Sequence, residues 1–199
     1  MAEIRDLAWP TKLAVIALWV FMAVKLLFGL AALQADVLSR QPDDGETLRL
    51  VDALGGIYAL VLLATVIIVG RWIYKASANA HQFAPDMTIT PGWAVGWYFV
   101  PFANLVMPFR AMREVWLASH HPHNWQDHFS PPLLGWWWGL WIADNVLSNI
   151  SFRVETPQIG GLANFAGAIV AIPLSLILIS IIKDVASAQN LVSRQEVFA

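Results

Sequence analysis

The side chains best suited to chemistry in this chain lie inside apolar segments. Lys25 interrupts the apolar run 13–35, and Asp144 interrupts the run 133–154. If both runs are helices that enter a bilayer from the same side, a rise of 1.5 Å per residue places both charges about 17 to 18 Å deep. A lone charge at mid-bilayer costs roughly 2.5 to 3.5 kcal/mol, so opposite charges at one depth are natural partners. We therefore predict a contact between Lys25 and Asp144.

Three amides extend this pair into a predicted intramembrane polar cluster. Its members are Lys25, Asn104, Asp144, Asn145 and Asn149. One interpretation makes the cluster a proton or ion relay, or a polar substrate site. The alternative is structural, because asparagine in membrane helices commonly fixes helix packing through hydrogen bonds.

A polar link at 120–132 holds four of the five histidines within nine residues. The residues with metal-ligating side chains are His120, His121, His123, Asp127 and His128. Neutral imidazoles are good ligands for zinc, copper or nickel, and a carboxylate can complete such a site. The spacing matches no closed metal motif, so two alternatives stand: a divalent-metal site formed by the four histidines, or a hydrated loop.

No pattern typical of an enzyme is present. The chain has no cysteine, which excludes thiol catalysis and disulfides. It has no phosphate loop or dinucleotide fingerprint, and its Ser, Asp and His residues have no spacing that defines a triad. A net charge of −2 without a long Lys or Arg run excludes a nucleic-acid partner. We expect no enzymatic activity, and no cofactor other than a metal at the histidines.

The elements that position these residues are membrane helices. Hydrophobic residues make up 58% of the 199 residues and charged residues only 13%, whereas about a quarter of an average soluble domain is charged. Four apolar runs are long enough to cross a bilayer and leave no room for a separate soluble domain. We predict an all-α integral membrane protein with one membrane domain over 1–199. Its spans are 13–35, 53–73, 133–154 and 162–182.

The stretch 90–119 is apolar but interrupted by Pro101, Asn104 and Pro108. Thr90 followed by Pro91 is a good helix start, and Pro108 can start a second helix. We predict two short helices joined at an unwound point, as a re-entrant or interfacial hairpin. Because unwound backbone at membrane depth must be satisfied by protein or trapped water, we expect its tip, near Phe102 and Asn104, to pack inside the bundle.

The distribution of basic residues favours four spans plus this hairpin over five spans. With four spans, one side carries Arg5, Lys12, Arg71, Lys75, Arg110, Arg113, Lys183 and Arg194, and the other carries Arg40, Arg49 and Arg153. With five spans the bias disappears. Cytoplasmic loops are enriched in Lys and Arg, so we expect both termini in the cytoplasm.

Three further expectations concern helix faces. Arg71, Lys75 and Asn79 recur every four residues, which predicts a face in water or headgroups beyond the second span. Arg110 and Glu114 are spaced as a surface pair, while Arg110 and Arg113 could instead contact anionic lipid headgroups. Small residues four apart in the last span predict close helix packing. They are Ala163, Gly167, Ala171 and Ser175.

Three segments carry a resemblance to a known family. They read WIYKASANA, PGWAVGWYFVPFANLVMPFRAMREVW and LLGWWWGLWIADNVLSNIS. The chain, from about Leu13 to Lys183, resembles the uncharacterised bacterial membrane family catalogued as domain of unknown function 4328. The motif residues are Pro101, Asn104, Pro108, Arg110, Glu114 and Trp116. The resemblance implies a multi-pass protein of the bacterial inner membrane, without an established activity.

These observations favour a membrane-embedded accessory or interaction protein. The alternative is a small transporter or channel component that uses the Lys, Asp and Asn cluster beside a broken helix, as transporter sites often do. A metal-binding membrane protein is the third hypothesis. The expected partners are the lipid bilayer and either another membrane protein or a second copy of the chain.

Overall fold

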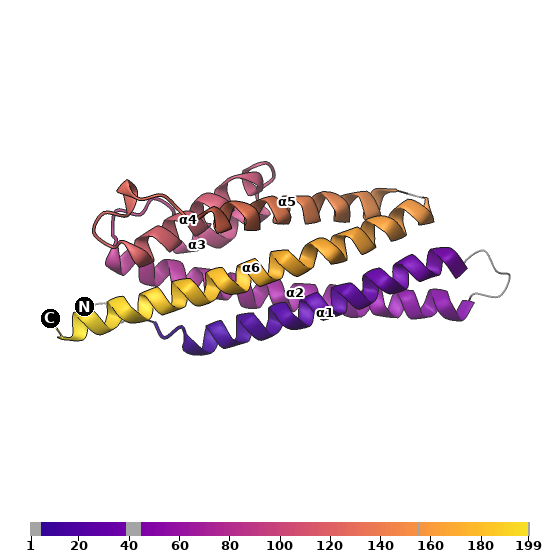
Figure 1. Ribbon diagram of the computed structural model, residues 1–199, viewed down its shortest axis with the longest axis horizontal. Helices are drawn as coiled ribbons and strands as arrows, with labels where there is room; N and C mark the ends of the chain where they lie inside the picture. Colours follow the sequence, from indigo (N-terminus) through magenta and orange to yellow (C-terminus); the bar gives the residue numbers. More distant parts are fainter. Residues whose placement is uncertain (1–4, 39–44, 155, 199) are drawn as a thin grey trace. The chain divides into compact units, whose positions relative to one another are not determined.

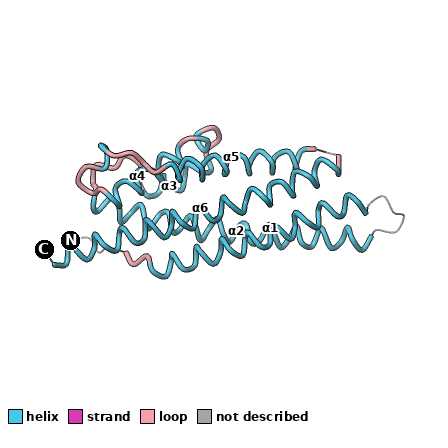
Figure 2. The backbone as a smooth tube through the Cα atoms, in the orientation of Figure 1, coloured by secondary structure: helices cyan, strands magenta, loops and turns pink. Residues whose placement is uncertain are grey.

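The computed structural model describes residues 5–38, 45–154 and 156–198, which contain helices and loops but no strand. The elements are α1 (Ala8–Leu38), α2 (Gly45–Phe83), α3 (Pro91–Gly96), η1 (Trp97–Phe99), η2 (Ala103–Leu105), α4 (Met107–His120), η3 (Trp125–Asp127), α5 (Pro132–Arg153) and α6 (Pro157–Phe198). Figures 1 and 2 show long helices connected by short loops. The prediction of an all-α protein is confirmed.

Among the described residues, three helices are long and apolar enough to cross a membrane. They are Ala8–Gln34, Arg49–Phe83 and Ile159–Arg194. The fourth predicted span forms a helix, α5, but its polar residues Asp144, Asn145 and Asn149 lower its mean hydropathy. The predicted basic position Arg40 lies outside the described residues.

The chain divides into two compact units, and several long helices contribute to both. The first unit consists of the described parts of 1–15, 67–138 and 177–199. It therefore contains the whole broken stretch, the histidine link and the described residues nearest to each end of the chain. Its most deeply buried side chains are Trp72, Met112, Leu117, Leu134, Trp137, Ile181 and Ile182. Within this unit α4 lies beside the C-terminal part of α6 (Figure 1).

The second unit consists of residues 16–66 and 139–176. Here α1 and α6 approach so closely that a Cβ atom at Gly29 would lie 2.8 Å from the Cβ of Ala168. A Cβ at Gly161 would lie 2.9 Å from the carbonyl oxygen of Ala32. The small residues at 163, 167, 171 and 175 are all buried, as their spacing predicted.

The broken stretch has the predicted breaks. Helix α3 begins at Pro91 after Thr90, and α4 begins at Met107 with Pro108 in its first turn. The expected position of the tip is wrong, because Phe102 is 87% exposed and Asn104 is only half-buried. The backbone of Phe102 has φ 62° and ψ −42°, which directs its side chain away from the protein instead of into it.

Helix α6 continues far beyond the predicted end of its span at 182. Val185 and Gln189 are both buried in this extension. Hydropathy marks only the part of a helix that suits lipid, so the packed extension had no apolar run to reveal it. The extension is nevertheless important, since it carries two residues of the polar network described next.

Candidate functional site

Glu114 anchors α4 to the loop that precedes α3. Its carboxylate is buried and accepts hydrogen bonds from the backbone N–H groups of Thr88 and Ile89, each at 3.0 Å, and from the hydroxyl of Thr88. The predicted surface pairing of Glu114 with Arg110 is therefore wrong. Backbone N–H groups in a turn are strong, obligatory donors, and they attract the carboxylate into the protein.

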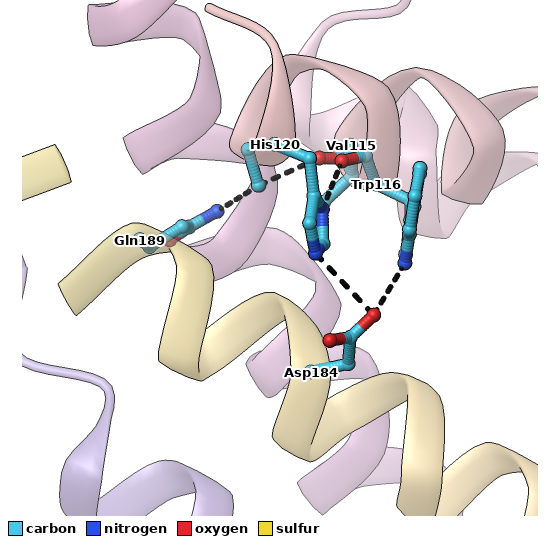
Figure 3. A network of polar contacts seen from close by, with 6 residues as sticks. Val115, Trp116, His120, Asp184 and Gln189 are labelled. Carbon is cyan, nitrogen blue, oxygen red and sulfur yellow. Dashed lines mark hydrogen bonds and ion pairs between the residues drawn. The ribbon is translucent and has the colours of Figure 1, made fainter. Parts of the chain in front are cut away.

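Trp116 and His120, one helical turn apart, both contact Asp184 of α6. Trp116 Nε1 donates to Asp184 Oδ2 at 2.7 Å, and His120 Nε2 lies 3.3 Å from the same oxygen (Figure 3). The two rings stack with their centroids 3.9 Å apart. His120 Nδ1 donates to the Trp116 carbonyl at 2.8 Å, so a protonated His120 donates from both of its ring nitrogens.

Asn79 lies at the centre of a second set of contacts, which joins three distant parts of the first unit. Its side chain exchanges two hydrogen bonds with the backbone of Arg5, at 2.8 and 2.9 Å, and donates to Gln189 Oε1 at 3.2 Å. Asn79 is only 1% exposed, so its prediction as a headgroup-facing residue is wrong. Of the other two residues on this face, Arg71 is exposed as predicted and Lys75 is half-buried.

Gln189 extends this network to α4. Its Nε2 donates to the Ala76 carbonyl and to Ser119 Oγ, both at 2.9 Å, and Ser119 donates to the Val115 carbonyl at 2.6 Å. Gln189 lies outside every apolar run, so the sequence predicted no role for it. The available signal was its four-residue spacing from the apolar Val185 on the same helix face.

The histidine link does not gather its four predicted ligands. His121 and His128 stack with centroids 3.7 Å apart, while His120 faces Asp184 and His123 is exposed. Burial lowers the pKa of His121, and the neighbouring His128 and His120 lower it further. No group of three or more His, Asp or Glu side chains placed to hold a metal occurs in the described part of the chain.

The second unit contains the predicted contact between Lys25 and Asp144. Lys25 Nζ donates to Asp144 Oδ1, and Lys25 is only 5% exposed. The ammonium also lies 5.5 Å from the centroid of the Phe21 ring. A Cβ atom at Gly167 would lie 3.5 Å from Asp144 Oδ1, an ordinary contact distance, so α6 packs directly beside the pair.

Two other members of the predicted polar cluster, Asn145 and Asn149, do not join this pair. Asn145 and Asn149 are exposed, and their amides donate back to carbonyls one turn earlier on α5, at 2.8 and 2.9 Å. A helical asparagine can reach the carbonyl of residue i−4. These two side-chain amides therefore find their hydrogen-bond acceptors within α5 itself. Asn104 belongs to the first unit.

The remaining motif residues lie around the two breaks of the first unit. Pro101 is exposed at the first break, whereas Pro108 is fully buried in the first turn of α4. On α4, Arg110 is exposed and Arg113 is half-buried, so both are accessible to a surface ligand.

Comparison with known proteins identifies the family. The family model described as Domain of unknown function (DUF4328) matches residues 46–187, which include every motif residue but leave out α1. No curated protein and no solved structure matches the chain. A match over this much of the chain, together with the confirmed helical breaks at the motif prolines, shows that the chain belongs to the DUF4328 family.

Proposed function

We propose that this protein is an accessory or interaction protein embedded in the bacterial inner membrane, with four spans and both termini in the cytoplasm. In this topology α5 is the span between α4 and α6. Its expected partners are the lipid bilayer and, in addition, either another membrane protein or a second copy of the chain. The first unit is the part presented to that protein partner at the cytoplasmic surface.

One observation carries this proposal: the grouping of basic residues. All eight basic residues assigned to the cytoplasmic side belong to the first unit, whereas Arg49 and Arg153, assigned to the other side, belong to the second. Positive charge is retained on the cytoplasmic side of membrane proteins. The contacts of Asn79 with Arg5 and Gln189 also favour an even number of spans, because they join segments near both ends of the chain.

The form of the α4 surface supports an interaction role. This helix is held in place by the hydrogen bonds of Glu114 and Ser119, while Arg110 near its start is exposed. A rigid, partly charged arm limits the entropy lost on binding, which favours recognition of a partner. Arg110 and Arg113 also suit contact with anionic lipid headgroups.

Photocrosslinking in native membranes tests the interaction role. The chain has no cysteine, so Arg110→Cys can carry a single photoreactive maleimide, and Arg49→Cys, exposed in the second unit, is the matched control. We expect the label at position 110 to form a discrete adduct with a second protein or a second copy, several-fold more than at position 49. Equal background adducts at both positions would overturn the interaction role.

Transport is the second candidate, and the buried Lys25 and Asp144 pair favours it. A charge pair inside a membrane bundle marks many ion and proton pathways. The pair nevertheless lies against Phe21 and is nearly closed to solvent, which suits a structural role. If folded Asp144→Asn protein in liposomes loses a proton or substrate flux that the unmodified protein supports, transport replaces the accessory role.

A further inference from the structure

The stretch between Asp86 and Arg110 contains no charged residue. Its turning point exposes four large apolar side chains, which we call the apolar tip. They are Phe99, Phe102, Leu105 and Val106. Phe99 is 71% exposed and Phe102 is 87% exposed. A soluble loop rarely presents such a set of side chains together, so their surroundings need an explanation.

The exposure of Phe102 is built into the backbone. Ala103 N–H donates to the Pro101 carbonyl at 2.7 Å, which closes a three-residue γ-turn with Phe102 at its centre. The positive φ of Phe102 belongs to the rare and strained form of this turn. Strain of this kind persists where the surrounding structure enforces it and clusters at functional positions.

Contacts inside the first unit place the apolar tip beside membrane helices. The Leu105 carbonyl accepts a hydrogen bond from Trp138 Nε1 of α5 at 3.0 Å, and the Trp138 ring lies 6.5 Å from that of Phe109. A Cβ atom at Gly70, in the apolar part of α2, would lie 3.4 Å from Val95 Cγ1. The hairpin thus packs against the apolar parts of two helices.

The direction of α4 gives the depth of the tip. Trp116 contacts Asp184 and Ser119 contacts Gln189, so α4 and α6 run in the same direction. Met107 precedes Trp116 by nine residues, or about 14 Å along the helix axis. The start of α4, and the tip before it, therefore lie toward the apolar part of α6 and away from its charged extension.

The backbone of the tip is suited to lipid contact. The N–H groups of residues 100, 103, 104, 105 and 106 all donate to carbonyls between residues 97 and 103. Irregular backbone is costly in hydrocarbon because its polar groups lack water. Local turns remove most of that cost here, so the tip does not need the interior of the bundle to satisfy its N–H groups.

From this geometry we propose that the apolar tip is a lipid-binding wedge, inserted among the acyl chains of the leaflet on the side of the first unit. Trp93, which is half-exposed, and Arg110 would then lie at headgroup level, where amphipathic aromatic and basic side chains are stable. The proposal rests on the membrane location proposed above and adds the ligand of this surface, the lipid acyl chain.

Fluorescence quenching in liposomes tests the wedge. A single cysteine at Phe102 is labelled with an environment-sensitive dye, and a cysteine at the exposed link residue Gln126 serves as the control. We expect lipid-attached quenchers to quench the label at 102 at least threefold more than the label at 126, and aqueous iodide to show the opposite preference. Phe99→Cys provides a second tip position if the Phe102→Cys protein does not fold.

Each remaining outcome is decisive. If iodide quenches position 102 as strongly as position 126, the tip lies in water and the wedge is wrong. If both quenchers fail at 102 while position 126 responds to iodide, a protein surface covers the tip and lipid is not its ligand. If the protein does not float with the liposomes, the proposed membrane location fails as well, which separates that failure from one of the wedge alone.

Discussion

At the scale of single residues, Glu114 shows how a charged side chain becomes structural. Its carboxylate takes the place of water as the hydrogen-bond acceptor of two backbone N–H groups and one hydroxyl in the loop before α3. Hydrogen bonds to a charged acceptor are about twice as strong as neutral ones. The anchoring of α4 by this residue therefore depends on its acceptor oxygen atoms and is strengthened by their charge.

We predict that Glu114→Ala lowers the free energy of unfolding by about 2 to 4 kcal/mol, because it removes the acceptor of the buried Ile89 N–H and of the partly buried Thr88 N–H. Glu114→Gln retains an acceptor oxygen and should cost only about 1 kcal/mol. Thermal unfolding in detergent measures both variants. Asp127→Asn, at an exposed carboxylate, is the control and should unfold like the unmodified protein. Equal losses in the Ala and Gln variants would contradict this account.

The histidine pair of the link should make stability depend on pH. The pKa of His121 is lowered in the folded protein, so the unfolded chain binds more protons between that pKa and its ordinary value of about 6.5. The contribution of His121 is fully present above pH 6.5 and is lost as the pH falls through the folded pKa. We expect a lower unfolding temperature at pH 5 than at pH 7.5.

The variant His121→Gln should reduce this difference between pH 5 and pH 7.5. His123→Gln is the matched control, since His123 is exposed and should leave the pH dependence unchanged. An equally steep pH dependence in the His121→Gln protein would show that other groups cause it.

At the scale of elements, close helix approach is decided by glycines that lack a Cβ atom. Gly29 on α1 and Gly161 on α6 each have no room for a methyl group. In lipid, helices associate through close packing because lipid tails are as apolar as the side chains. The contact between α1 and α6 in the second unit is therefore sensitive to single carbon atoms.

We predict that Gly29→Ala destabilises the protein by about 1 to 3 kcal/mol, as overpacking of a tight contact does. Gly56 is the control, because nothing lies within 4 Å of a Cβ atom built there. Gly56→Ala should be neutral or stabilising by up to about 1 kcal/mol, from helix propensity alone. Thermal unfolding in detergent measures both. A Gly29→Ala protein as stable as the Gly56→Ala protein would refute the close approach.

At the scale of the whole molecule, the main question is the number of membrane crossings. In the first unit Asn79 makes hydrogen bonds to two residues that are far away in the sequence. Arg5 is 74 positions from Asn79, and Gln189 is 110 positions from it. With five spans the segments of Arg5 and Gln189 would lie on opposite sides of the bilayer. Their shared contacts with Asn79 therefore favour an even number of crossings, as in the proposed four-span topology.

Cysteine accessibility in intact cells tests this topology. We expect Arg153→Cys to react with an impermeant maleimide from the periplasmic side and Gln126→Cys to react only after the membrane is permeabilised. Both positions are exposed in the folded protein, so burial does not limit either reaction. The reverse pattern would contradict the four-span topology with both termini in the cytoplasm.

The sequence alone determined the features that depend on spacing along one helix. Apolar length predicted the helices, Pro91 and Pro108 predicted the starts of α3 and α4, and the rise per residue predicted the meeting of Lys25 with Asp144. Each of these predictions needs only local geometry or a common depth in the bilayer.

Only the tertiary structure decided which helix faces meet. It buried Asn79 against Gln189, turned Glu114 toward Thr88 and exposed Phe102 at the tip. The physical reason is that the contacts of Asn79 and Glu114 depend on the rotation of one element against another, and the exposure of Phe102 on a strained turn. A polar side chain is satisfied by any partner within reach, and the spacing of residues along the chain does not specify that partner.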